Sequence, residues 1–166
     1  MELVFHTIPP IVSPESEILI LGTMPSPKSR ERAFYYAHPQ NRFWPALALA
    51  LGEPQPATNE EKADLILRHR LALWDVLASC EITGASDASI KNPVSNDIPA
   101  LIAHSRIRRV LCTGATSARL YTRLVYPQTK IPCEILPSPS ATNARMRLEN
   151  LAREYRRVLL DQPEKK

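Results

Sequence analysis

Apolar residues gather in four short runs that alternate with longer segments of helical periodicity. Each run is rich in Ile, Leu and Val and ends near Gly, Pro or polar residues, which is typical of strands buried on both faces. These runs predict strands at residues 17–22, 72–76, 109–113 and 132–136. Apolar positions three or four residues apart predict helices at residues 42–51, 60–69, 97–104, 115–124 and 143–160.

This alternation defines the expected fold class. Strands that alternate with helices form right-handed βαβ units, whose strands run parallel and are covered on both faces. We therefore predict an α/β fold, a three-layer α/β/α sandwich around a central, mainly parallel four-stranded sheet. The length of 166 residues fits a single domain over residues 1–160, followed by a frayed, charged tail over residues 161–166.

One long segment lacks either pattern. Residues 80–96 follow the second predicted strand and read as an irregular loop that contains Asp87 and Asn92. Loops of this length inside a compact domain are often functional. These two side chains fit either recognition of a ligand edge or ordinary turn chemistry.

The charge of the chain is modestly positive. Lys and Arg number 21 against 17 Asp and Glu, and 15 of the 21 are Arg, which suits bidentate contacts with phosphate. This balance favours a polyanionic partner, although the same excess is common on the solvated surfaces of unrelated enzymes.

Cysteine usage and the N-terminal sequence bound the environment. Cys80, Cys112 and Cys133 are widely spaced, with no CxxC pair and no His/Cys cluster, so we expect reduced thiols and no metal or cofactor. The first residues lack the basic and apolar regions of a signal peptide, and no apolar run reaches about 18 residues. We expect a cytoplasmic protein without a membrane segment.

Two loops at the predicted carboxyl ends of strands hold most of the polar chemistry. The first strand breaks at Gly22 into the Pro-punctuated loop TMPSP, and the aromatic segment YYAHPQNRFW follows. The second loop, LPSPSATNA at residues 136–144, leads to Asn143, which we expect to begin the final helix. This loop fits either a phosphate-binding turn or a simple turn with a helix cap. A site between the two loops would suit a flat, polar-edged ligand such as a nucleobase.

Four segments in this order resemble the uracil-DNA glycosylase superfamily, and within it the hypoxanthine-DNA (deoxyinosine) glycosylase family. They are GTMPS at residues 22–26, YYAHPQNRFWP at 35–45, LWDVLASCE at 73–81 and LPSPSATNA at 136–144. Taken jointly they are specific, whereas AHPxNxFW alone is moderate and LPSxS alone is weak. The resemblance spans about residues 10–158 and implies the same fold, DNA with a damaged base as partner, a monomer and no cofactor.

The resemblance also implies roles for individual residues. In mismatch-specific uracil/thymine relatives an asparagine before the proline positions the attacking water, but Met24 stands there, which leaves Asn41 as the catalytic amide. The implied base-binding residues are Gly22, Thr23, Met24, Pro25, Tyr36 and His38, with Tyr36 stacking on the extruded base. The implied DNA-binding residues are Ser26, Ser138, Pro139, Ser140 and Asn143. Pro139 and Ala141 depart from the Thr and Pro that are usual in the family.

Several of these residues also have structural interpretations. His38 fits a core histidine bonded to the backbone, and Asn41 fits a cap of the following helix. We expect Phe43 and Trp44 to anchor that helix in the core rather than to contact a base.

The predicted activity is that of a monofunctional DNA glycosylase of base excision repair. It would hydrolyse the N-glycosidic bond of deoxyinosine, release hypoxanthine and leave an abasic site. The alternatives are a mismatch-specific uracil/thymine-DNA glycosylase and a non-catalytic module that binds damaged DNA. A lyase would need an amine nucleophile such as Lys28 or Lys91, and nothing in the sequence marks either as desolvated.

Overall fold

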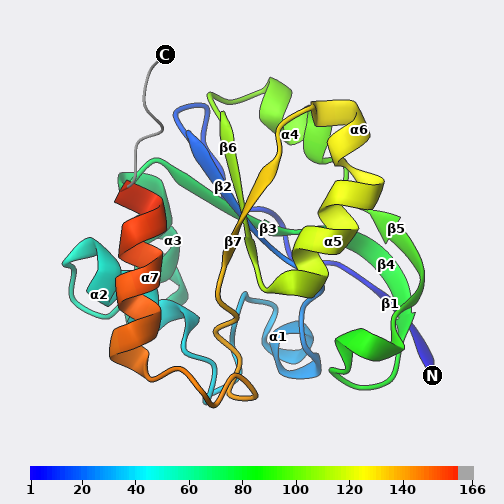
Figure 1. Ribbon diagram of the computed structural model, residues 1–166, viewed down its shortest axis with the longest axis horizontal. Coiled ribbons are helices and arrows are strands. Elements are labelled where there is room, and N and C mark those ends of the chain that lie inside the picture. Colours follow the sequence, from blue (N-terminus) through cyan, green and yellow to red (C-terminus); the bar gives the residue numbers. More distant parts are fainter. Residues whose placement is uncertain (161–166) are drawn as a thin grey trace.

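A four-stranded parallel sheet forms the middle layer of the computed structural model, which describes residues 1–160 (Figure 1). Its strand order is β3 (Leu71–Asp75), β2 (Ile18–Gly22), β6 (Arg109–Thr113) and β7 (Cys133–Leu136). Every neighbouring pair in this sheet is parallel, as the alternation of strands and helices predicts. The predicted charged tail, 161–166, lies outside the described residues.

Helices cover both faces of this sheet, which confirms the predicted three-layer sandwich (Figure 1). One face carries α2 (Phe43–Leu51), α3 (Asn59–Arg68) and α7 (Leu148–Leu160). The other carries α4 (Ile98–Ala103), α5 (Ala115–Leu124) and α6 (Tyr126–Thr129). Successive strand residues point to opposite faces, so Ile20 joins one hydrophobic core while Leu19 and Leu21 join the other.

A second sheet, which the sequence did not predict, packs beside the first (Figure 1). It is antiparallel, in the order β1 (Glu2–Phe5), β4 (Leu77–Ile82) and β5 (Lys91–Ser95). The prediction of an irregular loop over 80–96 is therefore wrong, because this range holds half of β4, a 3₁₀ turn η1 (Asp87–Ser89) and β5. The strands were obscured because β5 is mostly exposed and contains Pro93, a residue confined to sheet edges and bulges.

The segment before α7 corrects a second prediction. Asn143 does not begin the final helix, which starts at Leu148. The Asn143 side chain instead donates a 3.0 Å hydrogen bond to the carbonyl oxygen of Ser138 and holds the preceding loop. A short helix, α1 (Pro27–Arg32), also follows the first loop, where no helix was predicted.

Three features of the described residues concern membrane segments, thiols and metal sites. No helix there is long and apolar enough to cross a membrane. Cys80 and Cys112 are buried, Cys133 is half-buried, and all three are free thiols. Residues 1–160 contain no cluster of three or more His, Cys, Asp or Glu that could hold a metal ion.

Candidate active site

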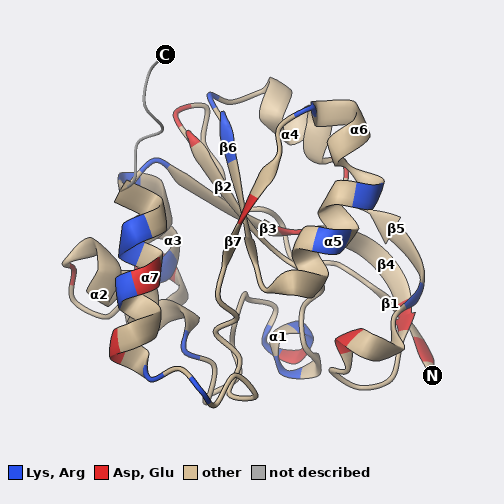
Figure 2. Cartoon of the chain, viewed as in Figure 1, with Lys and Arg blue, Asp and Glu red and all other residues tan. Residues whose placement is uncertain are grey.

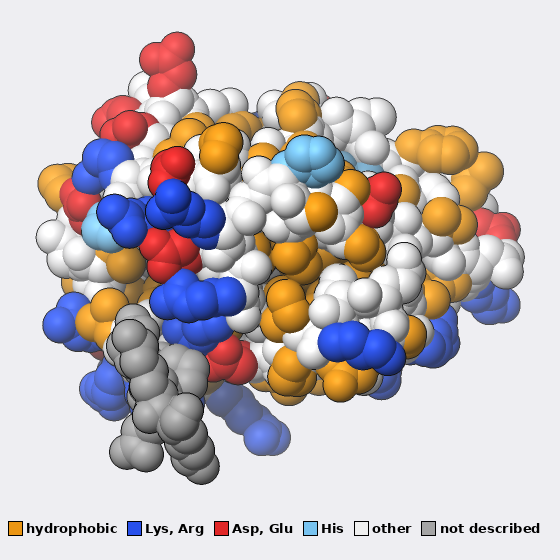
Figure 3. Space-filling model, turned by 90° about the horizontal axis from the view of Figure 1, so that it is seen from above, with side chains coloured by type: hydrophobic (Ala, Val, Ile, Leu, Met, Phe, Trp, Pro, Cys, Tyr) orange, Lys and Arg blue, Asp and Glu red, His pale blue; other side chains and the backbone are white. Residues whose placement is uncertain are grey.

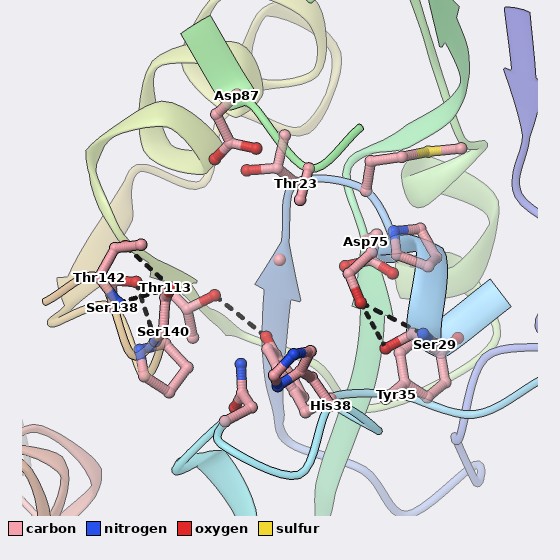
Figure 4. A pocket seen from close by; sticks show the side chains of 18 of the residues that line it. Thr23, Ser29, Tyr35, His38, Asp75, Asp87, Thr113, Ser138, Ser140 and Thr142 are labelled. Atoms are coloured by element: carbon pink, nitrogen blue, oxygen red, sulfur yellow. Dashed lines mark hydrogen bonds between the residues drawn. The ribbon is translucent and has the colours of Figure 1, made fainter. Parts of the chain in front are cut away.

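A cavity of about 420 Å³ opens at the carboxyl edge of the parallel sheet (Figure 4). Its walls come from the loop after β2, the segment 35–41, the end of β3, the β4–β5 connection and the loop after β7. Open α/β sheets bind their ligands at this edge, and the volume lies within the range of small-molecule sites. The cavity has room for a nucleobase.

The loop after β2 is held rigidly by main-chain hydrogen bonds. The backbone N–H of Val76 donates to the carbonyl oxygen of Gly22 at 2.8 Å, and that of Leu77 donates to Thr23 at 3.1 Å. Ser26 caps α1 by accepting a hydrogen bond from the backbone of Ser29 at 3.2 Å. The predicted residues 22–26 all line the cavity, but the Ser26 hydroxyl is engaged in this cap.

Tyr36 lines the cavity with one face of its ring already covered. Its ring stacks on Phe43 with centroids 4.1 Å apart and an interplanar angle of 18°. Its hydroxyl forms a 3.0 Å hydrogen bond with the hydroxyl of Thr113, and burial raises the pKa of the phenol. Phe43 and Trp44 are buried, which confirms them as core anchors. Tyr36 is therefore a neutral, fixed ring with at most one face left for a base.

Asn41 combines the two interpretations that its sequence position left open. Its side-chain oxygen accepts a 2.9 Å hydrogen bond from the backbone N–H of Phe43, at the start of α2. The residue is half-buried and lines the cavity. Because the oxygen is occupied, the amide group that Asn41 offers to a ligand is its NH₂, a donor.

His38 lies at the exposed rim of the cavity, so the interpretation as a core histidine is wrong. Its Nδ1 accepts a 3.1 Å hydrogen bond from the backbone N–H of Gln40. The bonded nitrogen is thus an acceptor, which leaves Nε2 as the donor that faces outward. Core placement fails because the following residues, Pro39 and Gln40, are exposed and carry the chain over the surface.

The loop after β7 forms the opposite wall as a tight serine turn. The hydroxyl of Ser138 accepts from the backbone N–H of Ser140 at 3.2 Å, and Ser140 bonds Thr142 through their hydroxyls at 2.9 Å. Ser138, Pro139 and Ser140 line the cavity, whereas Asn143 supports the turn from behind. This loop and the segment 35–41, which are far apart in the sequence, meet at one cavity as predicted.

Arg42 joins these two segments. Its guanidinium donates to the carbonyl oxygens of Ser140 at 2.8 Å and Asn143 at 2.9 Å, and also to that of Met146. Its backbone N–H donates to Pro139 at 3.0 Å. Arg42, which directly follows Asn41, thus ties the segment 35–41 to the serine turn and to the residues that follow it.

Two carboxylates, Asp75 and Asp87, also line the cavity, and only Asp87 was a candidate from the sequence. Asp87 lies near Thr23 at the exposed rim of the cavity. Partial loss of solvent around its carboxyl raises its pKa, and interaction with the Thr23 hydroxyl opposes this shift. Asn92 is not among the residues that line the cavity, and its amide donates to Glu81 across β5 and β4, so a contact between strands explains it and neither base recognition nor a turn does. Asp75 was missed. Its signal was available, because it is a charged residue at the end of an otherwise apolar strand.

Basic side chains flank the cavity at this edge. Figure 2 shows Lys and Arg on α1 and on the segment that leads into α7. On α1 these include Lys28 and Arg32, and before α7 they are the exposed Arg145 and Arg147. Cations on both sides of a pocket are suited to the backbone phosphates of a nucleic acid.

The fold and the site together define an α/β protein whose cavity has room for one flat base and whose basic rim suits a polyanionic chain. The family description for the uracil DNA glycosylase superfamily matches residues 9–160. The chain belongs to this superfamily, whose members are DNA glycosylases that hydrolyse N-glycosyl bonds.

Individual relatives agree with this assignment. The chain is 32% identical over 138 residues to a hypoxanthine DNA glycosylase of Methanosarcina acetivorans, covering 82% of this chain and 87% of that protein. It is 34% identical over 141 residues to a hypoxanthine DNA glycosylase of Methanosarcina barkeri, with the same coverage. A solution NMR structure from Methanosarcina acetivorans, provisionally described as a uracil DNA glycosylase, superposes with a TM-score of 0.78 at 29% identity, covering 92% of this chain and 94% of that one.

Proposed function

We propose that this protein is a monofunctional DNA glycosylase that releases hypoxanthine from deoxyinosine in DNA and leaves an abasic site. The observation that carries the proposal is the position of Asn41, which places a free amide donor in the cavity where Met24 supplies none. The two relatives at 32% and 34% identity, both hypoxanthine DNA glycosylases, favour the same substrate.

In the proposed reaction, the C1′–N9 bond breaks and its electrons leave with the base, while a water oxygen attacks C1′ and loses a proton to solvent. The departing base takes up a proton from solvent, so the products are hypoxanthine and an abasic site. The sugar carries positive charge in the transition state and the base carries negative charge. The Asn41 NH₂ donates a hydrogen bond either to the attacking water or to the departing base. Tyr36 stacks on the extruded base, and the turn at 138–140 holds the distorted strand.

The surroundings of the cavity support water, rather than an amine, as the nucleophile. A lyase mechanism needs a lysine close to C1′ to form a Schiff base. None of the described residues that line the cavity is a lysine. Lys28 pairs with Glu31 on α1 at 3.5 Å, and Lys91 is an exposed residue of β5.

The test uses labelled duplexes that carry one hypoxanthine, one uracil or one G·T mismatch. We expect strand scission only after alkali, with the fastest release on hypoxanthine. Scission without alkali, together with a borohydride-trapped adduct, would show a lyase instead. Faster release of uracil or thymine would favour the mismatch-specific alternative, and binding without release would favour the non-catalytic one.

A further inference from the structure

A buried pair of hydrogen-bonded side chains, His6 and Asp75, lies at the floor of the cavity and has no part in the mechanism above. Asp75 ends β3 and is 4% exposed, and one carboxylate oxygen, Oδ2, lies 2.8 Å from Nε2 of His6. The His6 side chain is 1% exposed and directly follows β1 of the second sheet. A carboxylate can only accept, so the Nε2 hydrogen of His6 is the donor.

The other carboxylate oxygen, Oδ1, is the free one. No described residue donates a hydrogen bond to it. The nearby Tyr36 hydroxyl is bonded to Thr113, whose own hydrogen goes to the carbonyl oxygen of Leu21 at 3.3 Å. Asp75 lines the cavity on the side of Ser29 and Tyr35, across from the serine turn (Figure 4). This carboxylate oxygen is open to the cavity and free to accept a hydrogen bond from water or from a ligand that displaces it.

Gly22 makes room for this oxygen. A Cβ atom at position 22 would lie 2.4 Å from Oδ1 of Asp75 and 3.0 Å from the Tyr36 hydroxyl. Glycine is therefore required here by the close approach of the carboxylate. The carboxylate rests against the first residue of the loop that lines the base site, which sets its distance from any base held there.

We propose that Asp75, oriented by His6, accepts the N1–H of the extruded hypoxanthine and thereby separates hypoxanthine from adenine. This inference rests on the proposed function. Deamination of adenine converts N1 from an acceptor into an N–H donor. A carboxylate oxygen attracts that donor in hypoxanthine and repels the N1 lone pair of adenine. Sites that contain a buried polar group discriminate strongly against ligands that leave it unpaired.

His6 acts as a positioning residue in this arrangement. Its hydrogen bond fixes Oδ2 and thus the rotation of the carboxylate, which leaves Oδ1 as the oxygen available to a ligand. Replacement of Asp75 by Asn keeps the shape. The amide oxygen retains the bond from His6, and the NH₂ group then takes the place of Oδ1 and opposes the N1–H of hypoxanthine.

The experiment compares the wild type with Asp75→Asn, His6→Ala and His6→Gln. The surface variant Asp97→Asn is the matched control, because Asp97 caps α4 and Asn caps equally well. Single-turnover release is measured on hypoxanthine and adenine duplexes. Affinity is measured for a duplex with uncleavable 2′-fluorodeoxyinosine and for one with tetrahydrofuran, an abasic analogue that offers no base edge.

We expect Asp75→Asn to weaken binding of the fluoroinosine duplex by about 10- to 100-fold and to leave tetrahydrofuran binding unchanged, as for loss of one hydrogen bond to a charged group. The ratio of hypoxanthine to adenine release should fall with it. His6→Ala should lose about 3- to 10-fold in the same affinity, and His6→Gln should recover part of that loss.

Three results would overturn the inference. For Asp75→Asn they are wild-type affinity for the fluoroinosine duplex together with wild-type release, an equal loss of affinity for both duplexes, and slower release with unchanged affinity. The first excludes base reading, the second indicates a structural role and the third places Asp75 in the chemical step. The proposed function is judged separately by hypoxanthine release from the wild type, and if that fails the affinities still decide the role of Asp75.

Discussion

The two edges of the parallel sheet both carry polar side chains but use them differently. At the amino edge, Glu17 accepts from Arg70 at 3.0 Å and from Arg108 at 2.6 Å, and Figure 3, seen from this side, shows acidic and basic side chains in contact. At the carboxyl edge, Asn41 and Asp75 each use one atom within the protein and leave another free in the cavity. Polar groups that are only half satisfied mark the edge that binds a ligand.

Substitution of Asn41, at the carboxyl edge, should have the largest effect on activity. We expect Asn41→Ala to slow hypoxanthine release by about 100-fold or more, the effect of removing one donor from a developing charge. Asn41→Ser keeps an oxygen for the backbone of Phe43 but lacks the NH₂ group, so it should lose as much activity while keeping more stability. Single-turnover kinetics and thermal melts measure the two effects. Release near the wild-type rate in either variant would exclude catalysis by Asn41.

Arg42 should produce a smaller effect, through the loop it holds. Arg42→Ala removes the guanidinium donor from three carbonyl oxygens, of which those of Ser140 and Asn143 keep a backbone N–H donor. We expect about 10-fold weaker DNA binding and a loss of about 2–3 kcal/mol in the free energy of unfolding. Arg156→Ala is the control, because it donates to one carbonyl, that of Ala50, away from the cavity. Fluorescence anisotropy and urea unfolding give the values. Equal effects of the two substitutions on DNA binding would show that DNA binding does not depend on the contacts of Arg42 with the serine turn.

The amino edge should give the smallest effect. Hydrogen bonds from Arg70 and then Arg108 lower the pKa of Glu17, so its ion pairs stabilise the fold above the unfolded value of about 4.3 and cease to do so as pH falls through the lowered pKa. Glu17→Gln should leave hypoxanthine release unchanged and lower Tm by less than about 3 °C at pH 7. The difference in Tm should shrink as the pH is lowered through the depressed pKa of Glu17. A loss of release would mean that this edge takes part in function.

The sequence predicted the parallel sheet well because its strands are continuous apolar runs and its helices have clear periodicity. The second sheet was not predicted, since β1 and β5 are largely exposed and carry no such run. Their pairing depends on β4, which follows β3 after a single residue, Val76. The start of α7 was also misplaced, because Asn143 resembles a helix cap locally but bonds the serine loop instead.

The sequence predicted those parts of the site that lie in loop motifs. Asn41, Tyr36 and the serine turn do meet at one cavity, although their roles remain predictions. Asp75 was passed over because strand residues are judged by burial, although its charge at the end of an apolar strand was a usable signal. His6 was missed because no local pattern links it to a residue 69 positions away. Arg42 was passed over as an ordinary cation, since its contacts with backbone carbonyls are tertiary.

The bond between His6 and Asp75 also joins the two sheets. β1 has four residues and pairs only with β4, so it lies at an edge of its sheet. Edge segments of this kind open locally at a lower free energy than the whole domain unfolds. Each such opening withdraws His6 and releases the carboxylate, so the amide hydrogen-exchange rates of β1 set an upper limit on how long the floor of the cavity keeps its shape.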